Sequence, residues 1–194
     1  MTFEIVVVGT SYGGLAALQT LLPALAPDFP LPVVVVQHRG KDRDTLCEFL
    51  QRYSVLPLTE PNDKDAIAPG RVYLAPRDYH LLVERDGFAL STEAPVSYAR
   101  PSVNVLFESA AEVYREHTVG VVLTGANADG ARGLAKIKAY GGMCVVEDPS
   151  SAESKGMPRA AIEAVTPDAV LPLARVAPFL NQLCQHEPRS SYAS

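Results

Sequence analysis

Three side chains with complementary acid–base chemistry follow three apolar segments of the sequence. Ser11 comes after the first segment, His38 after the second, and Asp129 in a polar stretch after residues 119–123. A serine, a histidine and an aspartate can serve as nucleophile, general base and orienting acid in acyl transfer. Each also has an ordinary structural explanation: Ser11 as a helix cap, His38 as a hydrogen-bonded residue at a strand end, and Asp129 as the N-cap of the next helix. They form a catalytic set only if the fold brings them together.

The segment around Ser11 is typical of a strand, a tight turn and a helix. The β-branched residues at 5–8 predict a strand that is buried on both faces. Glycines at 9, 13 and 14 permit a sharp turn, so a helix over residues 15–25 can begin close to the strand end. The N-terminus of that helix offers unpaired N–H groups beside the Ser11 hydroxyl. The same layout also occurs in phosphate-binding loops and in dinucleotide-binding folds.

Two features argue against a dinucleotide site. The fingerprint Gly-x-Gly-x-x-Gly needs a glycine where this chain has Ser11, and it needs an acidic residue at the end of the second strand to bind the ribose. The second predicted strand, residues 33–36, ends instead in Gln37 and His38. A residue that can act as a general base therefore stands where a nucleotide-binding protein needs a carboxylate.

Strand and helix patterns alternate along the chain. Asp86-Gly87 between two strand-like runs predicts an antiparallel hairpin. The expected strands cover residues 5–8, 33–36, 55–58, 71–74, 80–84, 88–91, 119–123, 143–146 and 169–171. The expected helices cover residues 15–25, 42 or 44 to 53, 101–117, 130–140, a segment that opens at Pro158, and 176–184. We therefore expect an α/β fold: a doubly wound, mostly parallel sheet in a three-layer αβα arrangement, with an antiparallel hairpin insertion.

In such a sheet the functional side chains lie at one edge, because ligands bind outside the carboxyl ends of the parallel strands. Ser11, His38 and Asp129 all follow strand ends, so we expect them to project from the same edge as a serine-hydrolase triad. Residues 9–13 also match the Gly-x-Ser-x-Gly motif of α/β-hydrolases. That fold places its acid before its histidine and needs an earlier strand for its oxyanion hole, whereas here the histidine comes first and four residues precede the first strand.

The composition bounds the remaining possibilities. The chain has 194 residues, 47% hydrophobic and 20% charged, with a net charge of −5. We expect one domain over residues 1–186 and a frayed polar tail at 187–194. No apolar run approaches the roughly 20 residues of a membrane span, no signal peptide is present, and no basic cluster suggests nucleic acid as a partner. The three cysteines are widely spaced, odd in number and lack metal-ligand spacing, so we expect reduced thiols and a cytoplasmic location. Acyl transfer by a Ser-His-Asp triad needs neither metal nor cofactor, so we expect none.

Six segments, collinear over roughly residues 4–180, resemble the catalytic domain of the chemotaxis protein-glutamate methylesterases (CheB type). They are Ser11-Tyr-Gly-Gly14, Val36-Gln-His38, Tyr73-Leu-Ala-Pro76 with His80, Arg100-Pro-Ser-Val-Asn-Val-Leu-Phe107, Leu123-Thr-Gly-Ala-Asn-Ala-Asp-Gly130 and Gly156-Met-Pro158.

The resemblance implies hydrolysis of glutamate γ-methyl esters on chemoreceptor helices and, in many members, deamidation of receptor glutamines. It implies no metal and no cofactor. By motif position it assigns the triad to Ser11, His38 and Asp129. It also implies that the oxyanion hole and substrate cleft are lined by Tyr12, Ala126, His80 and Met157.

The chain departs from the family pattern near the expected cleft. Relatives usually have Thr at Tyr12, Met at Arg39, Asp at Asn104, and Gly-Met-Gly-x-Asp-Gly at residues 125–130. Ala126 keeps a backbone donor but lacks the wall that a methionine side chain would form. Asn127 replaces a glycine, which constrains its φ unless it adopts the left-handed conformation.

These departures keep two alternatives open: a catalytically degenerate module that binds chemoreceptors or signalling partners, and an esterase for another carboxylic ester. Family members usually also carry a receiver domain before this one. Only four residues precede the first strand here, which suggests either a stand-alone esterase or a fragment.

Overall fold

The computed structural model describes residues 2–38 and 45–185. Its strands are β1 (Ile5–Thr10), β2 (Val33–Gln37), β3 (Leu58–Thr59), β4 (Val72–Leu74), β5 (His80–Glu84), β6 (Gly87–Ser91), β7 (Thr118–Val122), β8 (Met143–Glu147) and β9 (Ala169–Leu171). Its helices are α1 (Gly14–Leu21), α2 (Leu46–Gln51), α3 (Val103–Tyr114), α4 (Ala131–Ala139), α5 (Gly156–Ala164) and α6 (Leu173–Gln185), with 3-10 turns at Leu22–Ala24 and Arg115–His117.

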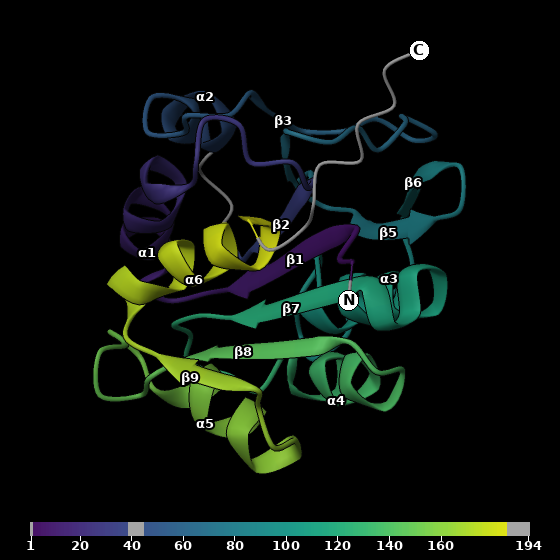
Figure 1. Ribbon diagram of the computed structural model, residues 1–194. Helices are drawn as coiled ribbons and strands as arrows, with labels where there is room; N and C mark the ends of the chain where they lie inside the picture. The colour runs from purple at the N-terminus through teal and green to yellow at the C-terminus, as the bar shows by residue number, and fades with distance from the viewer. Residues whose placement is uncertain (1, 39–44, 186–194) are drawn as a thin grey trace.

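Seven strands form one parallel sheet in the order β3-β4-β2-β1-β7-β8-β9 (Figure 1). β1 lies in the middle, between β2 and β7. The chain first adds β2, β3 and β4 on one side of β1 and then returns to add β7, β8 and β9 on the other side. This is the topology of a doubly wound sheet. The carboxyl ends of β1, β2 and β7 therefore lie side by side, as the sequence predicts.

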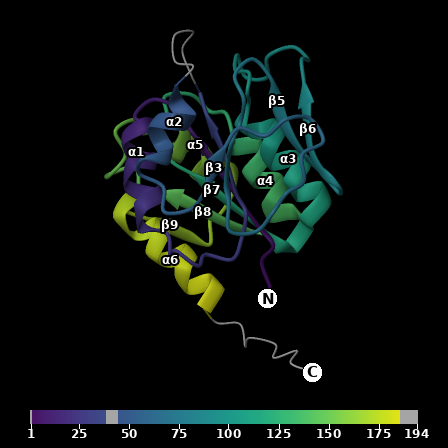
Figure 2. The same ribbon diagram turned by 90° about the horizontal axis from the view of Figure 1, so that it is seen from above.

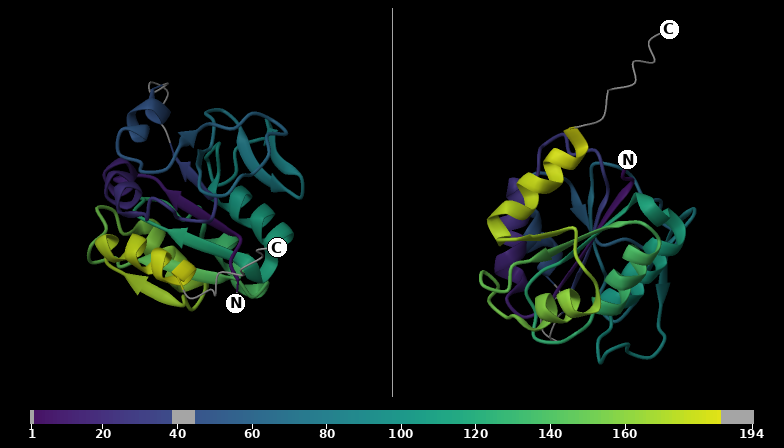
Figure 3. Two further views of the ribbon diagram at one scale, coloured as in Figure 1. Left: turned by 45° about the horizontal axis from the view of Figure 1, so that its top comes forward. Right: turned by 60° about the horizontal axis from the view of Figure 1, so that its bottom comes forward.

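Alternate residues of the central strands face two different cores. In β1, Val6 and Val8 pack with α1, α2 and α6, whereas Ile5 and Val7 pack with α3, α4 and α5. All four side chains are 0–1% exposed. A strand that is buried on both faces needs apolar residues at every position, which explains the continuous run of β-branched residues. Figure 3 shows α1 and α6 on one side of the sheet and α3 and α4 on the other, so the αβα layering is confirmed.

The predicted hairpin is present as a separate antiparallel sheet of β5 and β6. It packs against α3, as Figure 2 shows. Gly87 has a φ of +149°, and a Cβ there would lie 2.4 Å from the carbonyl oxygen of Asp65. The Phe88 ring lies 4.8 Å from the Tyr73 ring, which joins the hairpin to the sheet. The insertion therefore covers one end of the α3 layer.

Several element boundaries differ from the prediction. β3 covers only Leu58–Thr59, not 55–58, because the Gln51 side chain binds the backbone of Leu56 and Leu58. The first helix ends at Leu21, and a 3-10 turn that contains Pro23 follows it. α5 and α6 begin two and three residues earlier than expected, at Gly156 and Leu173.

Other sequence predictions fall on residues that the structure does not describe. They are a helix cap at Asp42 or Asp44, and the tail at 187–194; the first described cap of α2 is Thr45. Within residues 2–38 and 45–185, no helix combines the length and the apolar character needed to cross a membrane.

Candidate active site

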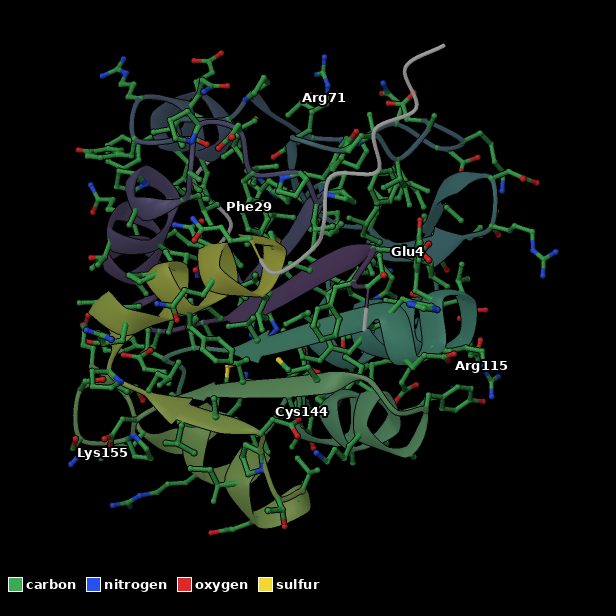
Figure 4. The ribbon with its side chains drawn as sticks, in the orientation of Figure 1. Glu4, Phe29, Arg71, Arg115, Cys144 and Lys155 are labelled. Carbon is green, nitrogen blue, oxygen red and sulfur yellow. The ribbon has the colours of Figure 1, made fainter. Side chains whose placement is uncertain are left out.

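Ser11, His38 and Asp129 meet at the carboxyl edge of the sheet. Ser11 directly follows β1, His38 directly follows β2, and Asp129 lies between β7 and α4. Ser11 Oγ lies 3.1 Å from His38 Nδ1, and His38 Nε2 lies 2.8 Å from Asp129 Oδ2. The His38 side chain is 13% exposed and that of Asp129 is fully buried. In Figure 4, Lys155 marks this side of the molecule, and Glu4 and Arg115 mark the opposite side.

The hydrogen bonds define the tautomer of His38. The fully buried carboxylate of Asp129 can only accept, so His38 Nε2 carries the proton and the Nδ1 lone pair faces the Ser11 hydroxyl. Burial acts to raise the pKa of Asp129. Hydrogen bonds from His38 and from the N–H groups of Asn104 and Val103 outweigh burial, and they hold that pKa below its usual value. Asp129 is therefore ionised at neutral pH and orients the imidazole as a base.

The N-terminus of α3 binds the Asp129 carboxylate. The backbone N–H groups of Val103 and Asn104 donate to its two oxygens at 2.7 and 3.0 Å, and the Ser102 hydroxyl donates at 2.8 Å. Free N–H groups and the positive end of the helix dipole favour an anion at this position. The Pro101-Ser102 pair correctly indicates where a helix begins, but no sequence signal shows that this helix faces Asp129.

Asn104 and Asp129 cap each other's helices. Asp129 caps α3, and the Asn104 side-chain oxygen accepts the N–H groups of Gly130 and Gly133 at the start of α4. The cap position of α4 is Gly130, with no side-chain hydrogen bond to its own helix. The ordinary explanation of Asp129 as the N-cap of the following helix is therefore wrong. This exchange fixes the acid relative to two helices at once.

The loop that carries Ser11 is held by its backbone. Ser11 N–H donates to Thr124 O at 2.9 Å, and Gln37 Nε2 donates to the carbonyls of both Ser11 and His38 at 2.9 and 2.8 Å. Sequence reasoning missed Gln37, which ties the serine and histidine segments together. A Cβ at Gly14 would lie 2.0 Å from Gln37 Oε1, so a side chain at this position would displace the Gln37 side chain that joins the two loops.

Two backbone donors beside Ser11 have no partner in the described part of the chain. The N–H of Ser11 is used by Thr124, and the N–H of Gly14 donates to Ser11 O. Among residues 2–38 and 45–185, no hydrogen bond involves the N–H groups of Tyr12 or Gly13. The N-terminus of α1 therefore presents free donors next to the serine hydroxyl.

The residues predicted to line the cleft occupy two kinds of position. Tyr12 is 64% exposed, and Ala126 is also exposed, with no described acceptor for its N–H. Met157 is 1% exposed and lies behind the serine: a Cβ at Gly125 would be 2.0 Å from Met157 Sδ and 3.0 Å from Ser11 Cβ. The absence of a side chain at residue 125 lets these two residues approach each other.

His80 lies behind the acid. Its side chain is 1% exposed, its Nδ1 accepts the N–H of Ser102 at 3.3 Å, and its Nε2 donates to the carbonyl of Ala94 at 3.1 Å. Ser102 in turn binds Asp129. The structure therefore connects His80 to the triad through Ser102, in a buried position.

Asn127 contacts the histidine directly. Its Nδ2 lies 3.2 Å from His38 Nδ1, and its Oδ1 accepts the N–H of Asp129 at 3.0 Å. It is not among the described residues with positive φ, so its backbone is unstrained without a glycine. Arg39, the neighbour of His38, lies outside the described residues.

The arrangement is chemically suited to acyl transfer. A hydroxyl faces a ring nitrogen that carries a lone pair, a buried carboxylate orients the ring, and free N–H groups lie beside the hydroxyl. Among residues 2–38 and 45–185, no group of three or more His, Cys, Asp or Glu side chains has the geometry to hold a metal ion.

Comparisons with known proteins agree with the resemblance seen in the sequence. The family model for CheB methylesterase matches residues 6–180. A Leptospira interrogans protein named for protein-glutamate methylesterase and protein-glutamine glutaminase activities is 46% identical over 188 residues, which are 96% of this chain and 97% of that protein. The Thermotoga maritima protein-glutamate methylesterase/protein-glutamine glutaminase is 38% identical over 93% of this chain but only 54% of its own length. The crystal structure of the Thermotoga maritima CheB methylesterase catalytic domain matches with a TM-score of 0.89 and 36% identity, covering 94% of this chain and all of that one.

Proposed function

Because the chain belongs to the CheB methylesterase family, we propose that it is a protein-glutamate methylesterase of chemosensory adaptation. Its substrates are glutamate γ-methyl esters on the helices of methyl-accepting chemoreceptors, in the cytoplasm. The names of its relatives also support a second reaction on the same scaffold, deamidation of receptor glutamines. Both reactions are acyl transfers to water and need no cofactor.

Acylation begins with proton transfer from Ser11 to His38. The Ser11 hydroxyl lies within hydrogen-bond distance of His38 Nδ1, so the imidazole takes its proton as Oγ attacks the γ-carbonyl. Asp129 holds the ring in the correct tautomer and stabilises the imidazolium that forms. The proton then passes from His38 to the leaving methoxide, and methanol departs.

Deacylation repeats the same steps with water as the nucleophile. His38 removes a proton from water, the hydroxide attacks the acyl-serine, and the proton returns to Ser11 Oγ as the ester bond breaks. The product is a glutamate carboxylate on the receptor. For a glutamine substrate the leaving group is ammonia, and the second half of the reaction is identical.

The tetrahedral intermediate needs donors for its oxyanion. The unpartnered N–H groups at Tyr12 and Gly13, and the N–H of Ala126 across the loop, are the donors we assign. Each such bond contributes about 3 kcal/mol when the donor is fixed in place. The side chain of Tyr12 is exposed beside these donors, where its phenol narrows the space for the acyl group.

The observation that carries this proposal is the continuous chain of short hydrogen bonds from Ser11 through His38 to the buried Asp129. A module that only docks on receptors does not need an ionised, fully buried aspartate aligned with a histidine and a serine. Such a charge is costly to bury, and here it is satisfied by four donors.

Two measurements test the proposal. A fluorophosphonate probe should label Ser11, since labelling requires an activated serine but not the natural substrate. The chain should also release methanol from methylated receptor membranes. Probe labelling without methanol release would point to another carboxylic ester as the substrate. Receptor binding with neither labelling nor methanol release would replace the esterase by the docking module.

A further inference from the structure

A second donor reaches the nitrogen that we assign as the general base. Asn127 Nδ2 lies 3.2 Å from His38 Nδ1, and Ser11 Oγ lies 3.1 Å from the same atom. The other ring nitrogen is occupied by the Asp129 carboxylate. A neutral imidazole has only one lone pair available for hydrogen bonding in its ring plane. The asparagine amide and the serine hydroxyl therefore share it.

A separate hydrogen bond fixes the orientation of the Asn127 amide. Its Oδ1 accepts the backbone N–H of Asp129 at 3.0 Å. Exchanging the oxygen and nitrogen would place an NH₂ group against that N–H and an oxygen against the ring lone pair, so both bonds would be lost. The group that faces His38 is therefore the NH₂, which can only donate.

The Asn127 donor stabilises the neutral imidazole, which is the state of His38 before the proton transfer. When Ser11 attacks, its proton moves to His38 Nδ1, and that nitrogen changes from acceptor to donor. The NH₂ of Asn127 then faces an N–H. The Asn127 bond exists before the transfer and is lost in the transition state, so it stabilises the ground state alone and slows the chemical step.

We propose that Asn127 is a positioning residue that restrains the general base. By donating to His38 Nδ1, it occupies the lone pair that must take the Ser11 proton and so slows acylation of Ser11. The inference rests on the proposed function, in which His38 takes the serine proton. Among the described residues, the groups that face the His38 ring are Asp129 and Asn127 from the β7–α4 loop and Ser11 from the β1–α1 loop. The carboxylate of Asp129 is the charged one, and it is unchanged in the variants below.

Two substitutions separate the donor from the rest of the side chain. Asn127→Ala removes both the NH₂ and the oxygen that accepts the Asp129 N–H. Asn127→Asp keeps that acceptor and replaces the NH₂ with an oxygen, which favours a proton on Nδ1. In Asn127→Ala the plateau rate of Ser11 labelling by a fluorophosphonate should rise roughly three- to tenfold, the equivalent of one lost hydrogen bond. The pH midpoint of labelling should increase in the order parent, Asn127→Ala, Asn127→Asp.

A second readout does not depend on activity. NMR titration of the His38 ring, assigned by its absence in His38→Gln, should give the same order of midpoints. The matched control is Asn62→Ala, which removes an exposed asparagine whose amide binds Asp65, and it should leave both readouts unchanged. Equal midpoints in the parent and Asn127→Ala would overturn the inference whatever the midpoint of Asn127→Asp, because the new negative charge of Asn127→Asp raises its midpoint by itself. So would a slower Asn127→Ala that Asn127→Asp restores with no change of midpoint, because Asn127 would then only support the Asp129 loop. If Ser11 is unlabelled in every variant, the proposed function fails, and the NMR midpoints still decide the role of Asn127.

Discussion

The N-termini of α1 and α3 both lie beside the proposed triad, but they differ in what their N–H groups bind. The N–H groups of α3 are filled by the permanent anion of Asp129, in a fully buried position. Those that precede α1, at Tyr12 and Gly13, have no partner in the described part of the chain and lie beside an exposed side chain. The free N–H groups and the positive dipole end of a helix thus bind the permanent carboxylate of Asp129 at α3. At α1 they remain available for the oxyanion that forms during the reaction.

The largest effect is expected where the transient anion forms. Ser11→Ala removes the nucleophile, so methanol release from methylated receptor should fall on the order of a millionfold. The hydroxyl bonds only His38 among the described residues, so the melting temperature should hardly change. Binding to receptor membranes serves as the control for folding. A variant that binds normally and retains a tenth of the parent activity would contradict the serine mechanism.

The next largest effect is expected at the N-terminus of α3, whose N–H groups bind Asp129. Asp129→Asn removes the charge at α3 and places an amide against His38 Nε2, which disfavours the working tautomer. Methanol release should fall on the order of ten-thousandfold, which is less than for Ser11→Ala. Asp28→Asn, at an exposed aspartate, is the matched control and should be silent. Equal activity of Asp129→Asn and the parent would show that the α3 charge is structural only.

The same charge predicts a pH dependence of stability. The pKa of Asp129 is held below its ordinary value of 3.8, so the folded state gains stability from the ionised form. This gain is fully present above about pH 5, well above the unfolded-state pKa, and is lost as the pH falls through the lowered pKa of the folded state. We therefore expect the difference in unfolding free energy between the parent and Asp129→Asn to be constant from pH 7 to about pH 5 and to shrink on further acidification. Chemical denaturation at each pH measures it, and a difference that grows in acid would refute the sign.

Removing one donor at the filled end should have a smaller effect. Ser102→Ala deletes the hydroxyl bond to Asp129 and leaves the two backbone donors of α3 in place. Stability should fall by about 1 kcal/mol and methanol release a few-fold. Ser109→Ala is the matched control, since this α3 serine is also buried but bonds Val83 and Leu106 instead. Ser109→Ala should lose stability and keep its activity. An equal loss of activity in Ser109→Ala and Ser102→Ala would show that lower stability of α3 alone reduces methanol release.

The smallest effect is expected at the open end. Tyr12→Thr removes an exposed phenol and leaves the backbone N–H and the triad unchanged. Methanol release from methylated receptor should rise a few-fold, with stability within about 0.5 kcal/mol of the parent. The rate of fluorophosphonate labelling should stay the same, because the probe is small. A fall in methanol release with unchanged labelling would instead make Tyr12 a contact that the receptor needs.

The sheet and the three central side chains could be predicted because they depend on local patterns. Continuous β-branched runs identify β1 and β2, and the apolar run at residues 119–123 identifies β7; the topology of parallel sheets then places Ser11, His38 and Asp129 at one edge. Boundaries were less accurate where side chains replace backbone pairing, as Gln51 does beside β3.

The supporting contacts could not be predicted, because they join segments whose relative placement no local pattern contains. Gln37 binds the backbone of Ser11, 26 residues away, and Asn104 accepts the N–H of Gly130, 26 residues later, at the start of α4. His80 was expected beside the cleft from motif position, whereas its contact with Ser102 depends on how the hairpin packs on α3. Such contacts require the packed structure.

The central position of β1 has a consequence for how the protein is made. Ile5 of β1 pairs with Thr118 of β7. One of the two edges of the central strand can therefore form its hydrogen bonds only after a segment more than a hundred residues later has been synthesised. A nascent chain exposes Ser11 and His38 long before Asp129 has left the ribosome, and it holds a nucleophile and a base without an orienting acid. Pairing over such a sequence separation is slow. The time at which Ser11 becomes reactive toward a fluorophosphonate therefore reports when β7 pairs with β1, both during translation and during refolding in vitro.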